Sequence, residues 1–211
     1  MIAYHEWIRF GHDPVYAKDF YALTRAEAQA FATKVIEAMP ERIQQLTEFV
    51  QYRRPRQGWT PDFTDGSFQV LVEVLHESVE KIPRSNAEVE KVRDGRSDIL
   101  NIIDEPIWRW KVTDRTISLA FDAALYFGND LIDKEDRMIW RLEERLNANR
   151  FQPIVRAPSK INKPPYLCVA PFDLFRSHVF RIANGDPHVY SLEQIRHHWM
   201  QNISRYKLLQ R

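Results

Sequence analysis

The chain has 211 residues, of which 44% are hydrophobic and 28% are charged, and these values predict a soluble globular protein. Thirty basic residues nearly balance 29 acidic ones, so the net charge of +1 gives no overall field that would attract nucleic acid or anionic lipid. Cys168 is the only cysteine, which excludes an intramolecular disulfide and a zinc site built from cysteines. The N-terminus lacks a signal-peptide pattern and no apolar run approaches the roughly 18 residues of a membrane span, so we expect a cytoplasmic protein.

The first part of the chain, residues 1–83, is predicted to be helical. Thr24 and Glu27 have the spacing of a capping box, which marks the start of a helix. Pro40 suits the first turn of a second helix, because a residue there needs no N–H donor. The inward-facing positions predicted for the first helix are Ala28, Phe31, Ala32, Val35, Ile36 and Met39.

A loop over residues 55–66 separates these helices from a third one. Ser67 is its predicted N-cap, and its apolar face is predicted to continue to Ile82, just before Pro83. Residues 86–98 are polar and without periodicity, so they form either a surface loop or a short exposed helix.

The periodicity then changes from helical to alternating. Residues 106–113 and 137–143 alternate apolar and polar side chains, as expected for half-buried strands. Between them lies an apolar helix over about residues 115–132. Residues 152–156 are a possible third strand, which Pro153 restricts to a sheet edge or to the start of the strand.

The C-terminal part of the chain is again predicted to be helical. A helix over residues 171–183 should end at Gly185, and Ser191 with Gln194 forms a second capping-box pattern. We therefore predict an α+β fold that is mostly helical, with one small antiparallel sheet packed by helices. The strands of that sheet are residues 106–113, 137–143 and 152–156. Residues 1–211 should form a single domain, with a helical N-terminal half (1–83) and a sheet-containing core (100–211).

Asp122 is an acidic residue on an otherwise apolar helix, and it shares a face with Tyr126 and Asn129. It is either a general base or a buried acid bonded to a tyrosine, an arginine or a tryptophan N–H. The second interpretation is favoured because a buried carboxylate must be paired. We therefore predict a structural polar core of Asp122, Tyr126 and Trp140.

Patterns that would indicate a metal or a cofactor are absent from the sequence. The seven histidines lack H-x-x-x-H or H-E-x-x-H spacing, and the six glycines form no phosphate-binding loop. Cys168 lies in an apolar segment, where we expect a buried and inert thiol. The sequence thus predicts no metal site, no catalytic residue and no cofactor.

A basic cluster with a tryptophan lies in the loop that precedes the third helix. The acidic residues that follow it make a mixed-charge surface, and arginine and tryptophan are favoured anchors at protein interfaces. The alternative is a solvated loop in which Trp59 packs back onto the core. Residues 93–105 form a second candidate surface, because loops often carry binding sites. The candidate partner-binding residues are Arg53, Arg54, Arg56, Trp59, Asp62, Asp65, Asp104 and Glu105.

The segment from Ser118 to Pro153 resembles a pattern found in small bacterial proteins. In these a Ser-x-Ala-x-Asp-x-x-x-Tyr-x-Gly-Glu helix leads into a tryptophan-bearing strand and an Asn/Gln-Pro turn; this chain has Asn129 in place of the Glu. Some of them resemble immunity or accessory proteins of polymorphic toxin systems. The resemblance implies a non-enzymatic protein that binds a cognate toxin or effector and occludes its active site or locks its conformation. It implies no catalytic residues.

Two other classes of function remain as alternatives. The first is a small hydrolase-like enzyme, whose groups would have to meet in one pocket. Its candidate residues are His12, Asp13, Asp122 and His188. The second is a nucleic-acid-associated accessory protein, which would need a continuous basic face. Its candidate residues are Arg53, Arg54, Arg56 and Arg109.

Overall fold

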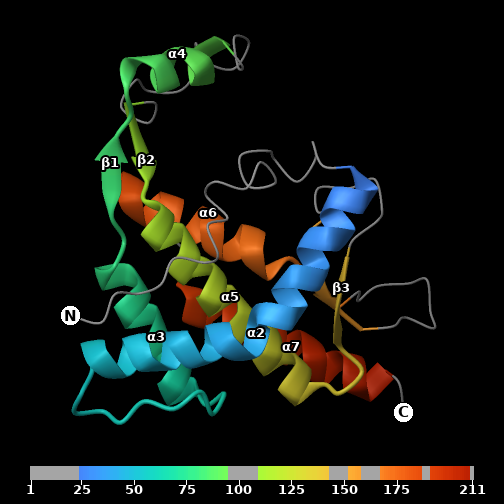
Figure 1. Cartoon of the computed structure of the whole chain (residues 1–211). Helices are drawn as coiled ribbons and strands as arrows, with labels where there is room; N and C mark the ends of the chain where they lie inside the picture. Colours follow the sequence, from blue (N-terminus) through green and yellow to red (C-terminus); the bar gives the residue numbers. More distant parts are fainter. Residues whose placement is uncertain (1–23, 95–108, 143–151, 158–166, 187–190, 210–211) are drawn as a thin grey trace.

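The computed structural model describes residues 24–94, 109–142, 152–157, 167–186 and 191–209 (Figure 1). Its helices are α2 (Arg25–Arg53), α3 (Asp65–Glu77), α4 (Asn86–Asp94), α5 (Asp114–Lys134), α6 (Pro171–Asn184) and α7 (Leu192–Leu209). Its strands are β1 (Lys81–Pro83), β2 (Trp110–Val112), β3 (Ile139–Leu142), β4 (Pro153–Arg156) and β5 (Cys168–Val169). The predicted α+β class is confirmed.

Helix α2 begins at the predicted capping box but extends beyond the end that the sequence predicts. The Thr24 hydroxyl accepts from the backbone N–H of Glu27, and the Glu27 carboxylate accepts from the backbone N–H of Thr24. The helix then continues through Pro40, so the prediction of a new helix starting there is wrong. The two halves of α2 nevertheless run in different directions (Figure 1), because proline lacks an N–H and crowds the preceding turn. Ile36 is 51% exposed, which corrects its predicted inward position.

Helix α3 begins earlier and ends earlier than predicted. Thr64, not Ser67, is the N-cap, and its hydroxyl accepts from the Ser67 N–H at 3.2 Å. The helix ends at Glu77, so the predicted extension to Ile82 is wrong. Residues 81–83 form β1 instead, because their backbone pairs with β2. Helix α4 follows, in agreement with the short-helix alternative for this region.

The strands belong to two sheets rather than one. β1 pairs antiparallel with β2, placing Ile82 opposite Lys111, while β3, β4 and β5 form a separate antiparallel sheet. The prediction of one sheet is therefore wrong: residues 110–112 of the predicted strand 106–113 pair with β1, in a region predicted to be helical. Residues 106–108 of that prediction lie outside the described residues. β4 is the central strand of its sheet, and Pro153 is its first residue, the position that proline tolerates.

The β1–β2 ribbon rises from the body and carries α4 at its far end (Figure 1). We call residues 81–94 and 110–112 the arm. Its strands are connected beyond the paired residues, since the Arg84 N–H donates to the Arg109 carbonyl at 2.7 Å and the Thr113 N–H donates to the Glu80 carbonyl at 3.0 Å. The arm is therefore a defined ribbon rather than an irregular loop.

Helix α5 runs through the centre of the body and contacts α2, α3, α6 and α7. Every residue from Ser118 to Gly128 is buried, so this helix is enclosed on all sides. Aromatic rings fill the space between α5 and α6, where Phe121 meets Phe172 edge to face at 4.9 Å and Phe127 meets Phe175 at 5.7 Å. Polar side chains on such a helix must find partners inside the protein.

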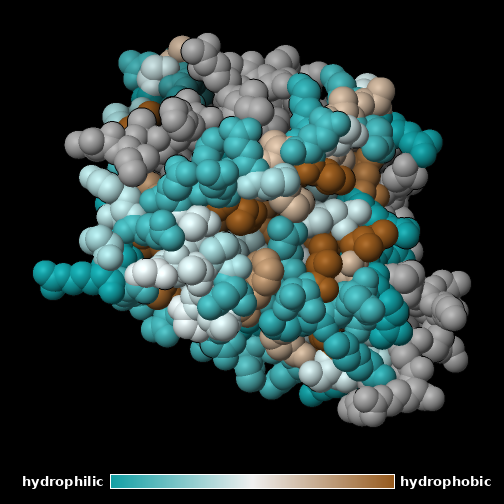
Figure 2. All heavy atoms as spheres, turned by 60° about the horizontal axis from the view of Figure 1, so that its bottom comes forward, coloured by the Kyte–Doolittle hydropathy of each residue, from teal (hydrophilic) through white to brown (hydrophobic). Residues whose placement is uncertain are grey.

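The helices of the C-terminal part end and begin as predicted. Gly185 caps α6 with φ of 69°, a left-handed conformation that favours glycine. Ser191 and Gln194 exchange the two hydrogen bonds of a capping box before α7. None of the helices within the described ranges is long and apolar enough to cross a membrane. On the face drawn in Figure 2, hydrophobic atoms are interspersed among hydrophilic ones.

Candidate functional site

Three polar side chains follow one another at four-residue intervals along α5. Asp122, Tyr126 and Asp130 therefore lie on one face of the helix, and each has 0% exposure. Each bonds to a different part of the chain. Their contacts show whether the centre of the molecule could be a reaction site or is a structural framework.

Asp122 forms a two-point ion pair with Arg42 of α2. The Arg42 Nε donates to Oδ1 at 2.9 Å and Nη2 donates to Oδ2 at 2.5 Å, and the side chains are 3% and 0% exposed. Burial raises the pKa of Asp122 and lowers the pKa of Arg42 to about 10, so desolvation opposes both charges. Their mutual contact favours the ionised form of each. Asp122 is thus enclosed and bonded to an arginine, as its structural interpretation expects.

Tyr126 joins α5 to the start of α3. Its hydroxyl lies 2.6 Å from Ser67 Oγ and accepts from the backbone N–H of Phe63 at 3.0 Å. Burial raises the pKa of Tyr126 to about 12, so the phenol stays protonated at neutral pH. The ring packs against Trp59 and Phe63, with centroids 5.7 and 5.1 Å away. Tyr126 therefore holds a loop rather than offering a reactive oxygen.

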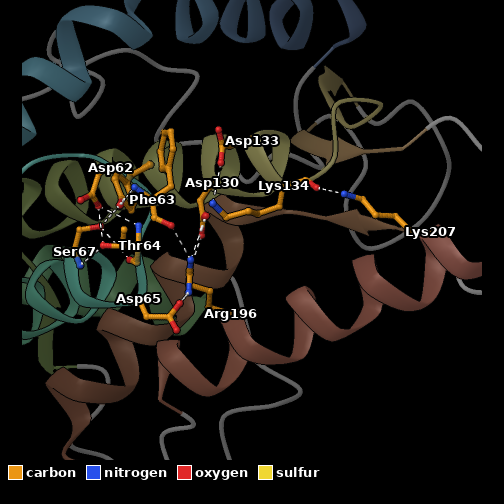
Figure 3. A network of polar contacts seen from close by, with 11 residues as sticks. Asp62, Phe63, Thr64, Asp65, Ser67, Asp130, Asp133, Lys134, Arg196 and Lys207 are labelled. Carbon is orange, nitrogen blue, oxygen red and sulfur yellow. Dashed lines mark hydrogen bonds and ion pairs between the residues drawn. The ribbon is translucent and has the colours of Figure 1, made fainter.

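Asp130 and Arg196 form a second buried ion pair, shown in Figure 3. Arg196 of α7 donates to the Asp130 carboxylate through Nε at 2.5 Å and Nη2 at 3.3 Å. It also donates to Asp65 at the first position of α3, and to the Phe63 carbonyl at 3.1 Å. One guanidinium thus connects α3, α5 and α7. Sequence reasoning missed both residues, although Asp130 continues the four-residue spacing that begins at Asp122.

Trp140 packs where α5 meets β3. Its Nε1 donates to Asn129 Oδ1 at 3.0 Å. A Cβ at Gly128 would lie 2.1 Å from Cζ2 of this ring, so only glycine permits the close approach. Asn129, which replaces the glutamate of the bacterial pattern, is here the acceptor for the tryptophan N–H.

The loop proposed from the sequence as a partner-binding surface is largely occupied by internal contacts. Trp59 is 3% exposed and its Nε1 donates to the Ser67 carbonyl at 2.8 Å, so the alternative in which it packs on the core is the one observed. Arg54 donates to both oxygens of Glu77 at 3.0 and 2.5 Å, and Arg53 bonds to the same carboxylate. Asp62 accepts from the N–H and the hydroxyl of Thr64.

The other candidate partner-binding residues differ in exposure, and two of them lie outside the described residues. Asp65 is bonded to Arg196, although its own side chain is 96% exposed. Arg56 is exposed at the turn after α2. Asp104 and Glu105 lie outside the described residues. The structure therefore removes Trp59 from the candidate surface. Arg56, Asp62 and Asp65 remain exposed charged residues.

The groups of the catalytic alternative are not assembled in the part of the chain that the structure describes. Asp122 is enclosed with Arg42, and His12, Asp13 and His188 lie outside the described residues. No group of three or more histidine, cysteine, aspartate or glutamate side chains there could hold a metal ion. Cys168 is partly exposed on β5, which corrects its expected burial in the core.

The basic face of the nucleic-acid alternative is also weakened. Arg53 and Arg54 share the single carboxylate of Glu77, which offsets one of their two positive charges. Ion-paired arginines release fewer counterions from a phosphate backbone, and counterion release provides most of nonspecific affinity.

Comparisons with known proteins provide no family for the chain. No family model, curated protein or solved structure matches it.

The arm presents exposed side chains in a fixed geometry. Lys81, Ile82 and Pro83 of β1 are exposed, and Ile82 keeps 43% of its surface accessible. Helix α4 is attached to β2 by the Glu88–Lys111 pair at 2.5 Å, which lowers the pKa of Glu88 to about 2. An apolar side chain flanked by charges on a preorganised ribbon is suited to binding another protein.

Proposed function

We propose that this chain is a non-enzymatic protein of the immunity type, which binds a cognate bacterial toxin or effector in the cytoplasm. Binding would neutralise the toxin by occluding its active site or locking its conformation. The observation that carries the proposal is the arm, which extends from the body with Ile82 exposed among charged residues. The resemblance of residues 118–153 to toxin-associated proteins provides the class of partner.

The ionisable groups of the core favour binding over catalysis. A general acid or base must reach a substrate, and in the described interior Asp122 and Asp130 are fully enclosed by their arginine partners. These pairs fix the positions of α2, α5 and α7 relative to one another. A rigid body of this kind keeps the arm preorganised, which lowers the entropic cost of association.

The arm also has features of an interface anchor. Ile82 provides apolar area, while Lys81 and the nearby Glu88 provide charges that orient an approaching partner. At the root of the arm, where β1 leaves the body, Lys81 is held in place because its Nζ donates to the Ala183 carbonyl at 2.8 Å. This side chain would therefore lose little freedom on binding.

Co-expression with the product of the adjacent gene tests the proposal. We expect that product to inhibit growth alone, growth to be restored by this chain, and the two proteins to elute as one complex in size-exclusion chromatography. If the neighbouring product is harmless, or the two elute separately, the immunity function is wrong.

A matched pair of variants tests the role of the arm. Ile82→Glu should weaken the complex by at least about tenfold in Kd, measured by calorimetry, because it places a charge in the apolar centre of the contact. Ile36→Glu is the control, since Ile36 is 51% exposed in the first half of α2, away from the arm in Figure 1. Equal losses, or a loss only with the control, would place the interface elsewhere.

A further inference from the structure

Two histidines meet at the place where the arm joins the body. His76 lies in the last turn of α3 and His178 in the middle of α6, and their Nε2 atoms are 2.8 Å apart. Their rings are stacked with centroids 5.0 Å apart. His178 is 4% exposed, whereas His76 is an exposed residue. The function proposed above uses neither residue.

The position of this pair connects it to the arm. The chain passes from His76 through Ser78 directly into β1. Helix α6 also contacts the ribbon beyond His178. The ring of Phe180 packs on that of Trp110, with centroids 6.4 Å apart, and the Ala183 carbonyl accepts from Lys81 Nζ. The histidine contact therefore joins the end of α3 to α6, and α6 also contacts β1 and β2 of the arm.

The chemistry of the contact depends on the number of protons it carries. Two neutral imidazoles form the hydrogen bond with one as donor and the other as acceptor. A singly protonated pair also forms it, because the imidazolium donates to the neutral ring. With both rings protonated there are only donors, and two positive charges face each other across 2.8 Å.

Charged groups around the pair set where this second protonation occurs. Burial lowers the pKa of His178 to about 4, and the charges of His76 and Arg181 act in the same direction. Burial also lowers the pKa of His76, with Glu193 at the start of α7 opposing this shift. Glu77, next to His76, is paired with both Arg53 and Arg54, so this group carries one net positive charge. Arg181 on α6 lowers the pKa of His178, and Glu193 on α7 raises that of His76.

We infer that the His76–His178 contact is a pH-dependent switch at the root of the arm, residues 78–83 and 110–112. The contact holds this root on α6 when at most one ring is protonated, and releases it when both rings are protonated. The inference concerns the arm itself and does not require the proposed toxin. Unfolded histidines take up protons near pH 6.5, above both folded pKa values. The contact therefore stabilises the folded state above about pH 6.5, and this stabilisation is lost as the pH falls toward about 4.

Hydrogen–deuterium exchange of the full chain at about pH 7 and pH 4 measures the release directly. After correction for intrinsic exchange rates, we expect exchange of residues 78–83 and 110–112 to rise by about tenfold or more at the lower pH. Residues 119–127 of α5 are the internal reference and should stay protected. The Glu88–Lys111 pair remains ionised at pH 4, because the pKa of Glu88 is about 2.

Substitution by glutamine distinguishes the histidine contact from other acid effects. In the His76→Gln variant, the new side-chain amide can donate to a neutral His178 or, after an amide flip, accept from a protonated one. This variant should show no rise in exchange at the root of the arm. His198→Gln is the matched control and should behave as the wild type, since His198 is an exposed histidine bonded along its own helix to Asn202.

Three results would overturn the inference. These are an unchanged exchange rate in the wild type at pH 4, an equal rise in the His76→Gln variant, and a rise that extends equally to residues 119–127. His76 is exposed, so its replacement should not prevent folding. His178→Gln provides a second variant with the same expected result.

Discussion

The acids along α5 show how single residues hold this fold together. Asp122 and Asp130 are buried completely, and each is compensated by an arginine 80 or 66 residues away in the chain. Such a pair adds little net stability compared with apolar side chains of similar volume, because both charges lose their hydration. What it provides is specificity: the carboxylate accepts only one arrangement of its neighbours, and breaking the pair leaves an uncompensated charge in the core.

Removing the cation tests the contribution of the Arg42–Asp122 pair to stability. Arg42→Leu should lower the free energy of unfolding by about 3–5 kcal/mol at pH 7, since it leaves Asp122 buried without its cation. Without Arg42 the pKa of Asp122 rises further above its unfolded value, so the folded variant binds the extra proton. Its deficit should therefore be smaller at pH 4 than at pH 7. Urea denaturation at the two pH values measures both effects.

The double variant Arg42→Leu/Asp122→Leu is the control for this pair. It removes both charges together, so it should regain most of the stability lost in Arg42→Leu. If the double variant is as unstable as the sum of the two single ones, the pair is not coupled as the structure indicates.

At the level of elements, the distance between α5 and β3 is set by one glycine. Trp140 lies over Gly128 closely enough that an added Cβ would overlap the ring at 2.1 Å. The indole also bonds to Asn129 in the next position of the same helix, so it cannot turn away without losing that bond. The helix and the strand are therefore held together by a contact that has no room for adjustment.

Gly128→Ala should destabilise the protein by at least about 2 kcal/mol, because β3 or the helix must move to admit the methyl group. Gly66→Ala is the matched control. A Cβ there would come no closer than 4.0 Å to Thr64, and alanine in the first turn of α3 should be neutral or stabilising by up to about 1 kcal/mol. Thermal unfolding of both variants checks the difference. Similar melting temperatures would show that Trp140 can adjust.

Elements with local signals were predictable from the sequence, and those that depend on distant partners were not. The capping boxes at Thr24 and Ser191 and the glycine after α6 are encoded within a few residues. β1 has only three residues, and they form a strand because β2 pairs with them about 30 residues later. Arg42 and Arg196 have no feature in sequence that separates them from surface arginines. Their burial depends on carboxylates that only the folded chain brings close.

For the whole molecule, the contacts of α5 join the two halves of the chain into one core. α2 and α3 come from the first half, whereas α5, α6 and α7 come from the second, and apolar residues of all five form one cluster. The ion pairs cross the same boundary, since Arg42 and Asp65 bond to residues of α5 and α7. In the described residues, the two halves thus contribute to one shared core.

The chain should therefore unfold as one cooperative unit. In urea, the loss of helical circular dichroism and the change in tryptophan fluorescence should have the same midpoint, because Trp59 of the first half and Trp140 of the second belong to one core. A fragment of residues 1–94 should remain unfolded, since it lacks α5 and would expose Leu46, Phe49 and Phe68 to water. Two separate midpoints, or a fragment with native-like cooperative unfolding, would mean that the N-terminal helices are an independent domain and that the buried arginine pairs join two finished units.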